Sequence, residues 1–185
     1  MLLQTAIVSS LIMTGQTLPD SAHTPGYVQQ LLRTYRFLDR YKERRQMSLP
    51  LDPERFNEME DFLWAFFQNC WHVKDWIRHD ESLGNDLRRR VWDDIQKHQS
   101  LLIVADVANG TKHFASKPNL EWVGADSKQI CITPNSDGTL FIAHEIGLKD
   151  GTRISASEAA DRAMEAWREI LQRHDMHSIA ESPAS

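Results

Sequence analysis

One apolar repeat between residues 56 and 77 constrains this chain more than any other feature. Its members follow strict three-four alternation: Phe56, Met59, Leu63, Phe66, Cys70, Val73 and Ile77. This spacing gathers them on one face of an α-helix, and a stripe of that length must pack against other helices. Asp52 and Pro53 suit the N-cap and first turn. We therefore predict a long helix that forms the central wall of an antiparallel bundle.

Other segments also have helical periodicity or helix-start signals. Apolar residues recur at three-and-four spacing within residues 28–38 and 100–114, and a shorter helix is expected at 86–97. Ser155 and Glu158 have the spacing of a capping box, which marks the start of a last helix. The sequence therefore predicts four or five helices in all.

A β-hairpin is expected between the last two helices. The apolar runs Gln129–Thr133 and Leu140–Ala143 flank the turn-forming sequence Pro134–Gly138. The predicted fold class is thus mainly α: a bundle of four to five helices with a small antiparallel β-hairpin, at about residues 120–154, before the C-terminal helix.

The chain of 185 residues has the length of one ordinary domain, and its sequence contains no long linker or internal repeat. We expect an N-terminal arm at 1–24, a single domain at 25–175 and a flexible tail at 176–185. The opening residues lack the basic start of a secretory signal and are too short and polar to span a bilayer. No membrane association is therefore predicted.

Charge and cysteine content limit the function classes. Lys and Arg number 21 against 26 Asp and Glu, a formal net charge of -5, so a nucleic-acid surface would have to be local. The two cysteines form no CxxC pair. Because sparse, unpaired cysteines suit a reducing compartment, we expect a cytoplasmic protein.

Two polar stripes are the strongest candidates for chemistry. One stripe runs along the long helix from Gln68 to His79. The second stripe lies within the expected 100–114 helix. If these helices pack antiparallel, five side chains would converge into a catalytic site able to transfer protons or hold a divalent metal: His72, Asp75, Asp106, Asn109 and His113. The alternative is that these groups face solvent or satisfy local hydrogen bonds.

Recognised catalytic and cofactor motifs are absent from the sequence. There is no HExxH or paired ExxH ligand spacing, no GxSxG elbow, no P-loop and no GxGxxG. We therefore predict no metal and no cofactor.

Two groups of basic side chains could bind a phosphate backbone. One is a stripe at helical spacing, and the other is a run on the predicted 86–97 helix: Arg33, Arg36, Arg40 and Arg44, then Arg88, Arg89 and Arg90. Binding through these side chains would depend strongly on salt. The alternative is an ordinary solvated helix face.

The run Ala108–His113, after a Trp-rich helix that includes Cys70–Trp76, resembles small bacterial helical-bundle proteins and the HEPN superfamily over residues 50–115. That resemblance implies an often dimeric helical bundle, with many members acting as metal-independent ribonucleases of toxin or defence systems. The superfamily signature is an Arg and a following His with four to six residues between them. Here only Arg168 and His174 match it literally, and no Arg stands at that distance before His113.

Three function hypotheses follow. The first is an RNA-directed module, either a ribonuclease or an RNA binder, in which the resemblance implies a His as general acid/base and an Arg as charge stabiliser. The second is a non-enzymatic interaction module that forms homo-oligomers or docks a protein through the Trp-rich helix or the N-terminal arm. The third is a metal-dependent bundle enzyme using His72, Asp75, Asp106 and His113.

Overall fold

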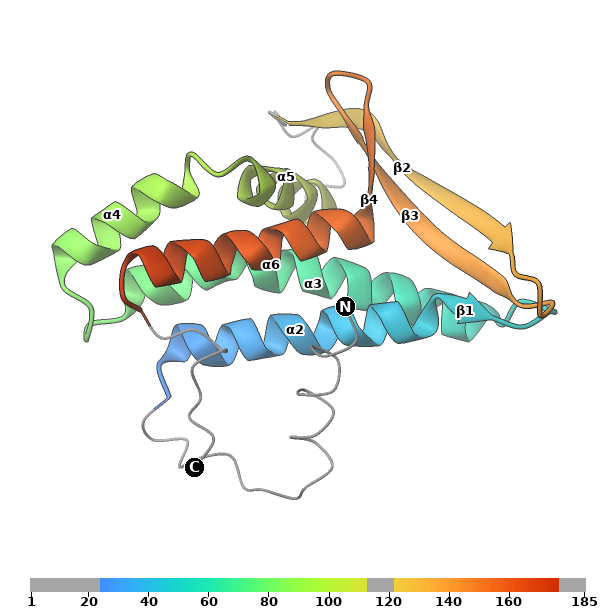
Figure 1. The fold of residues 1–185 in the computed structure, drawn as a ribbon, viewed down its shortest axis with the longest axis horizontal. Coiled ribbons are helices and arrows are strands. Elements are labelled where there is room, and N and C mark those ends of the chain that lie inside the picture. The colour runs from blue at the N-terminus through green and yellow to red at the C-terminus, as the bar shows by residue number, and fades with distance from the viewer. Residues whose placement is uncertain (1–23, 113–121, 177–185) are drawn as a thin grey trace.

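The computed structural model describes residues 24–112 and 122–176. These residues form five helices and a four-stranded antiparallel sheet (Figure 1), which confirms the predicted mainly α class. In chain order the elements are α2 (Gly26–Arg44), β1 (Gln46–Met47), α3 (Pro53–His79), α4 (Asn85–Ile95), α5 (Gln99–Lys112), β2 (Val123–Pro134), β3 (Leu140–Leu148), β4 (Arg153–Ser155) and α6 (Ala156–Arg173).

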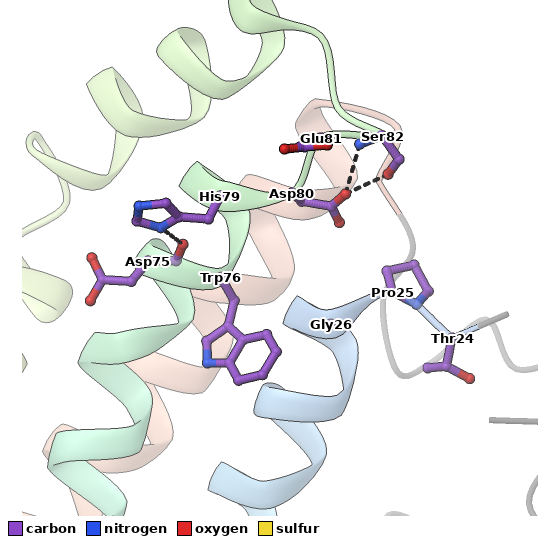
Figure 2. Close-up of a pocket in the computed structure, with 9 residues that line it drawn as sticks. All are labelled: Thr24, Pro25, Gly26, Asp75, Trp76, His79, Asp80, Glu81 and Ser82. Atoms are coloured by element: carbon purple, nitrogen blue, oxygen red, sulfur yellow. Dashed lines mark hydrogen bonds between the residues drawn. The ribbon is translucent and has the colours of Figure 1, made fainter. Parts of the chain in front are cut away.

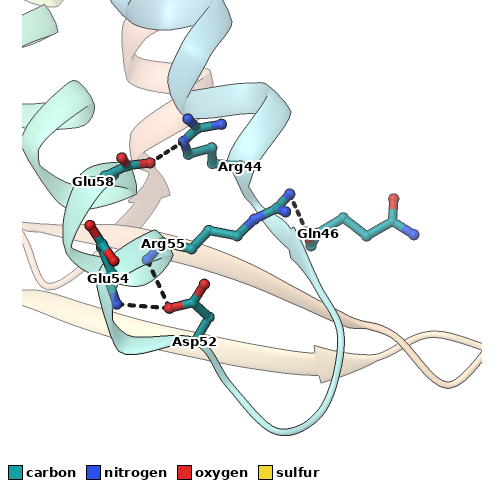
Figure 3. Close-up of polar contacts among 6 residues, drawn as sticks. All are labelled: Arg44, Gln46, Asp52, Glu54, Arg55 and Glu58. Atoms are coloured by element: carbon teal, nitrogen blue, oxygen red, sulfur yellow. Dashed lines mark hydrogen bonds and ion pairs between the residues drawn. The ribbon is translucent and has the colours of Figure 1, made fainter.

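Helix α3 is the central element, as its apolar repeat predicts. All members of the repeat except the half-buried Phe56 are buried. The helix begins where expected, because one carboxylate oxygen of Asp52 accepts hydrogen bonds from the backbone N–H groups of Glu54 and Arg55 (Figure 3). Helices α2, α5 and α6 all pack against α3, and α2 and α6 lie along it (Figure 1).

Polar contacts hold the junction between α2 and α3 (Figure 3). Arg44 Nε donates to Glu58 Oε2 at 2.7 Å, and Arg55 Nη2 donates to the backbone oxygen of Gln46 at 3.2 Å. The first pair joins the last turn of α2 to the first turns of α3, and the second joins β1 to α3, so the two helices run antiparallel from this end (Figure 1).

The sheet has the order β1–β3–β2, and β4 pairs with β3 on the same side as β1. Three alternate residues of β3 are buried against the helices: Ile142, His144 and Ile146. The hairpin lies within the predicted region 120–154, although β2 starts at Val123, well before the apolar run Gln129–Thr133 from which its first strand was predicted. Strands β1 and β4, of two and three residues, were not predicted because they are too short to show a period-two pattern.

The last helix begins with the predicted cap. Ser155 Oγ accepts a hydrogen bond from the backbone N–H of Glu158 at 3.0 Å, and α6 buries Trp167 within its apolar side. The predicted 86–97 helix corresponds to α4 and the predicted 100–114 helix to α5.

The predicted N-terminal arm and C-terminal tail lie outside the described residues, apart from Thr24 and Met176. Within the described part of the chain, no helix combines the length and apolar character needed to cross a membrane.

Candidate functional site

In the C-terminal half of α3, polar side chains of the predicted stripe make contacts within the helix itself. Lys74 Nζ donates to Asp75 Oδ1 at 2.6 Å and lies 4.8 Å from the centre of the Trp71 ring. His79 is exposed, and its Nδ1 lies 2.7 Å from the backbone oxygen of Asp75. His72, the other predicted member on this helix, is half-buried.

An open pocket of about 640 Å³ lies beside this part of α3, at the start of α2 (Figure 2). Its lining residues are Thr24, Pro25, Gly26, Asp75, Trp76, His79, Asp80, Glu81 and Ser82. Asp80 caps the following turn, since Oδ1 accepts from the backbone N–H and the hydroxyl of Ser82. Trp76 is 43% exposed, so the Trp-rich helix does present an aromatic surface here.

Asp106 acts as a backbone anchor. Its Oδ2 accepts hydrogen bonds from the N–H groups of Trp122, at 2.5 Å, and Val123, at 3.0 Å. The residue is buried, so this carboxylate holds Trp122 and Val123, at the start of β2, against α5. Asn109 lies half-buried on the same helix, while His113 falls outside the described residues.

The predicted site members therefore have different neighbours. Asp75 lines the pocket at the start of α2, whereas Asp106 binds the start of β2. Among residues 24–112 and 122–176, no group of three or more His, Cys, Asp and Glu side chains could hold a metal ion. The contacts of Asp75 and Asp106 thus lie in different parts of the fold, and the predicted convergence of the five side chains stays a prediction.

The predicted arginine stripe of α2 is partly engaged with its own molecule. The guanidinium carbons of Arg40 and Arg44 lie 5.6 and 5.4 Å from the centre of the Phe62 ring, and Arg44 also pairs with Glu58. Arg33 donates to the side chain of Gln30. A further member, Arg36, is exposed and forms no ion pair with the described residues.

The second basic group, on α4, behaves similarly. Arg88 donates to the backbone oxygen of Arg78, and Arg89 forms an ion pair with Asp86. Arg90 is exposed and has no ion-pair partner in the part of the chain that the structure describes.

The literal Arg–His match on α6 is divided between two ion pairs. Arg168 pairs with Glu165, whereas His174 Nε2 lies 3.0 Å from Asp94 Oδ2. Desolvation opposes ionisation of Asp94, but hydrogen bonds from Arg173 and His174 outweigh it and lower the pKa of this carboxyl. The two signature residues thus have separate carboxylate partners.

The buried histidine of β3 was not among the predicted site residues. His144 on β3 is 4% exposed; its Nδ1 lies 3.4 Å from the Tyr41 hydroxyl and its Nε2 lies 3.2 Å from Glu60 Oε1. The rings of Tyr41, Phe56 and Trp64 surround it. Desolvation lowers the pKa of His144, although the contact with Glu60 opposes that shift.

The setting of His144 favours a structural role. A side chain so deeply buried is out of reach of a bulky substrate, and both ring nitrogens have partners. The sequence does carry one signal for it, because His144 alternates with Ile142 and Ile146 and so belongs to the inward face of its strand.

The outer edge of the sheet is the remaining candidate surface. Within the described residues, β2 pairs only with β3, so its other edge is unpaired. Ile130 and Ile132 on this strand are 43% and 49% exposed. Residues 129–136 carry no charged side chain, although charges are a usual protection of open edges.

Comparison of the chain with protein-family models, curated proteins and solved structures finds no significant match. The resemblance to the HEPN superfamily stays a prediction.

Proposed function

We propose that this chain is a non-enzymatic protein-interaction module that binds an extended backbone segment along the free edge of β2. The observation that carries this proposal is the uncharged C-terminal half of β2, residues 129–134, with its exposed Ile130 and Ile132. In strand addition, main-chain hydrogen bonds supply affinity, and alternate side chains of the added segment supply specificity.

Hydrogen bonds on the inner side of β3 support the availability of this edge. The N–H of Ile142 donates to the oxygen of Arg45 before β1, and the N–H of Leu148 donates to the oxygen of Thr152 before β4. Backbone groups of a strand alternate in direction. The even-numbered residues of β3 therefore direct their N–H and C=O groups away from β2.

The register between β2 and β3 determines which residues of β2 direct their backbone groups to the free edge. Ile132 lies opposite Ile142 and Ile130 lies opposite His144. Neither pair exchanges hydrogen bonds, because the backbone N–H and C=O groups of the β3 residue point away from β2. In such antiparallel pairs the groups of both residues point outward. The N–H and C=O of Ile130 and Ile132 are thus directed to the free edge, ready for a further strand.

The apolar side chains on the edge add a binding surface. Ile130 and Ile132 share the face of the sheet that carries the buried Ile142 and His144, yet both are more than two-fifths exposed. An added strand with apolar residues at alternate positions would cover them, and each square ångström of apolar surface removed from water contributes roughly 25 cal/mol.

The RNA-directed alternative is supported by Arg36 and Arg90, which are exposed and form no ion pair with the described residues. Against it stand the net charge of -5 and the packing of Arg40 and Arg44 against Phe62. Salt-sensitive binding of a mixed-sequence single-stranded RNA that is lost in Arg36→Ala would favour this alternative.

A peptide selection tests strand addition directly. We expect the full chain to enrich, from a displayed library of random heptapeptides, sequences with β-branched residues at alternate positions. Synthetic copies should shift the amide NMR signals of Ile130 and Ile132. Ile132→Lys should abolish binding, whereas Leu49→Lys, which changes another exposed apolar side chain, should retain it. No enrichment at a protein concentration where the chain is monomeric, or equal binding by both variants, would overturn the proposal.

A further inference from the structure

We propose that the strand added to β2 is β2 of a second copy of this chain, paired antiparallel about a twofold axis at Cys131. This inference rests on the proposed strand addition and names its partner. A twofold interface uses one patch on both copies, so the patch must complement itself. The free edge of β2 meets that requirement in its side chains, its backbone groups and its charge.

The side-chain pattern is symmetric about Cys131. Reading outward in either direction, an isoleucine comes first and then an uncharged polar residue: Gln129, Ile130, Cys131, Ile132 and Thr133. Placing Cys131 opposite its own copy therefore puts each Ile130 opposite an Ile132. The four exposed isoleucines then form one apolar cluster on a single face of the joined sheet.

The backbone pattern is compatible with the same register. Ile130 and Ile132 present their N–H and C=O groups to the free edge, so an Ile130–Ile132 pair exchanges two hydrogen bonds. If the register shifted by one residue, these groups would lie opposite residues whose N–H and C=O groups already bond to β3. A shift by two in one direction would place Ile130 opposite Pro134, which has no N–H.

Charge does not oppose the pairing. The nearest charged residues along the chain are Lys128 and Asp137, on either side of the uncharged segment. No like charges therefore meet within the five central pairs, although the chain as a whole carries a net charge of -5. Between Lys128 and Pro134 the edge thus carries no charge that would oppose strand pairing.

Cys131 supplies a built-in reporter of the register. In this register it forms a pair without hydrogen bonds, where Cα atoms are about 4.5 Å apart. That spacing is within the range that a disulfide spans. Cys131 is half-buried in the single chain, whereas Cys70, the other cysteine, is fully buried in the core and cannot compete.

Mild oxidation of the full chain with copper–phenanthroline, which removes two hydrogens from a pair of thiols, tests the register. We expect a species of doubled mass on a non-reducing gel, with Cys131 linked to Cys131 by peptide mapping. Cys131→Ser should lose it. Ile132→Lys should form neither the crosslinked species nor a dimer, as measured by sedimentation equilibrium. Leu49→Lys should form both.

Two results would overturn the inference: a monomeric mass at all concentrations, or a crosslink that Ile132→Lys leaves undiminished. Failure here is distinguishable from failure of the proposed function. A monomer that still binds the selected peptides through Ile132 would overturn only the symmetric dimer, whereas loss of peptide binding as well would overturn strand addition itself.

Discussion

His144 Nε2 on β3 lies 3.2 Å from Glu60 Oε1 on α3, so an imidazole and a carboxylate meet where the sheet packs on the helix. The Glu60 side chain is 32% exposed, whereas that of His144 is 5% exposed. The pair therefore extends from the surface into the core. Desolvation outweighs the carboxylate and lowers the pKa of His144, which favours a neutral ring in the folded protein.

This pKa shift predicts a pH dependence of stability. The unfolded chain takes up a proton on His144 near the ordinary value of 6.5, whereas the folded chain does so only at lower pH. The contribution of His144 is thus complete above pH 6.5 and is lost as pH falls toward the folded pKa. When urea unfolding is measured from pH 7.5 to 5, the free energy of unfolding should decline less for His144→Gln than for the parent protein.

The control for that prediction is Glu60→Gln. Removing the carboxylate removes the interaction that raises the pKa of His144, so the histidine should titrate at still lower pH in an NMR titration. An unchanged or higher His144 pKa in Glu60→Gln would contradict the assigned cause. An identical pH profile for His144→Gln and the parent protein would contradict the linkage.

The Asp106 anchor predicts a loss of stability on truncation. Asp106→Ala leaves the amides of Trp122 and Val123 without their charged acceptor, and hydrogen bonds to charged groups are worth about 1.5–3 kcal/mol. We expect the free energy of unfolding in urea to fall by about 2 kcal/mol or more. Asp106→Asn keeps an acceptor oxygen and should lose less. Equal losses would show that the acceptor does not stabilise the fold.

The contact between the start of α2 and α3 predicts a difference between two glycines. A methyl group at Gly26 would lie 2.7 Å from Cε3 of Trp76, whereas one at Gly84 would have no atom within 4 Å. Gly26→Ala should destabilise the protein by about 1–3 kcal/mol, because the ring must move. Gly84→Ala should stay within about 1 kcal/mol of the parent protein. Thermal unfolding of both variants measures this, and similar midpoints would contradict the packing.

The sequence predicted α3 and α6 well because their signals are local. The apolar repeat from Phe56 to Ile77 and the caps at Asp52 and Ser155 lie within or beside the helices that they define. The hairpin was also found from local signals, since its turn residues separate two apolar runs. Local patterns of this kind do not depend on the rest of the fold.

Contacts between distant residues could not be predicted in the same way. His144 is 84 positions from Glu60, and nothing near either residue identifies the other. The proposed convergence of Asp75 with Asp106 depended on helix packing that spacing alone does not determine. The free edge of β2 was missed because it depends on β1 and β4, both of which pair on the opposite side of β3.

Amide hydrogen exchange at Ile130 and Ile132 tests the central claim most directly. In a single copy the N–H groups of both residues face the open edge, and in the paired form each donates to the other copy. The account predicts rapid exchange at low protein concentration and strong protection at high concentration, with Cys131 protected throughout by β3. Rapid exchange of Ile130 and Ile132 at every concentration, or protection that does not depend on concentration, would contradict it.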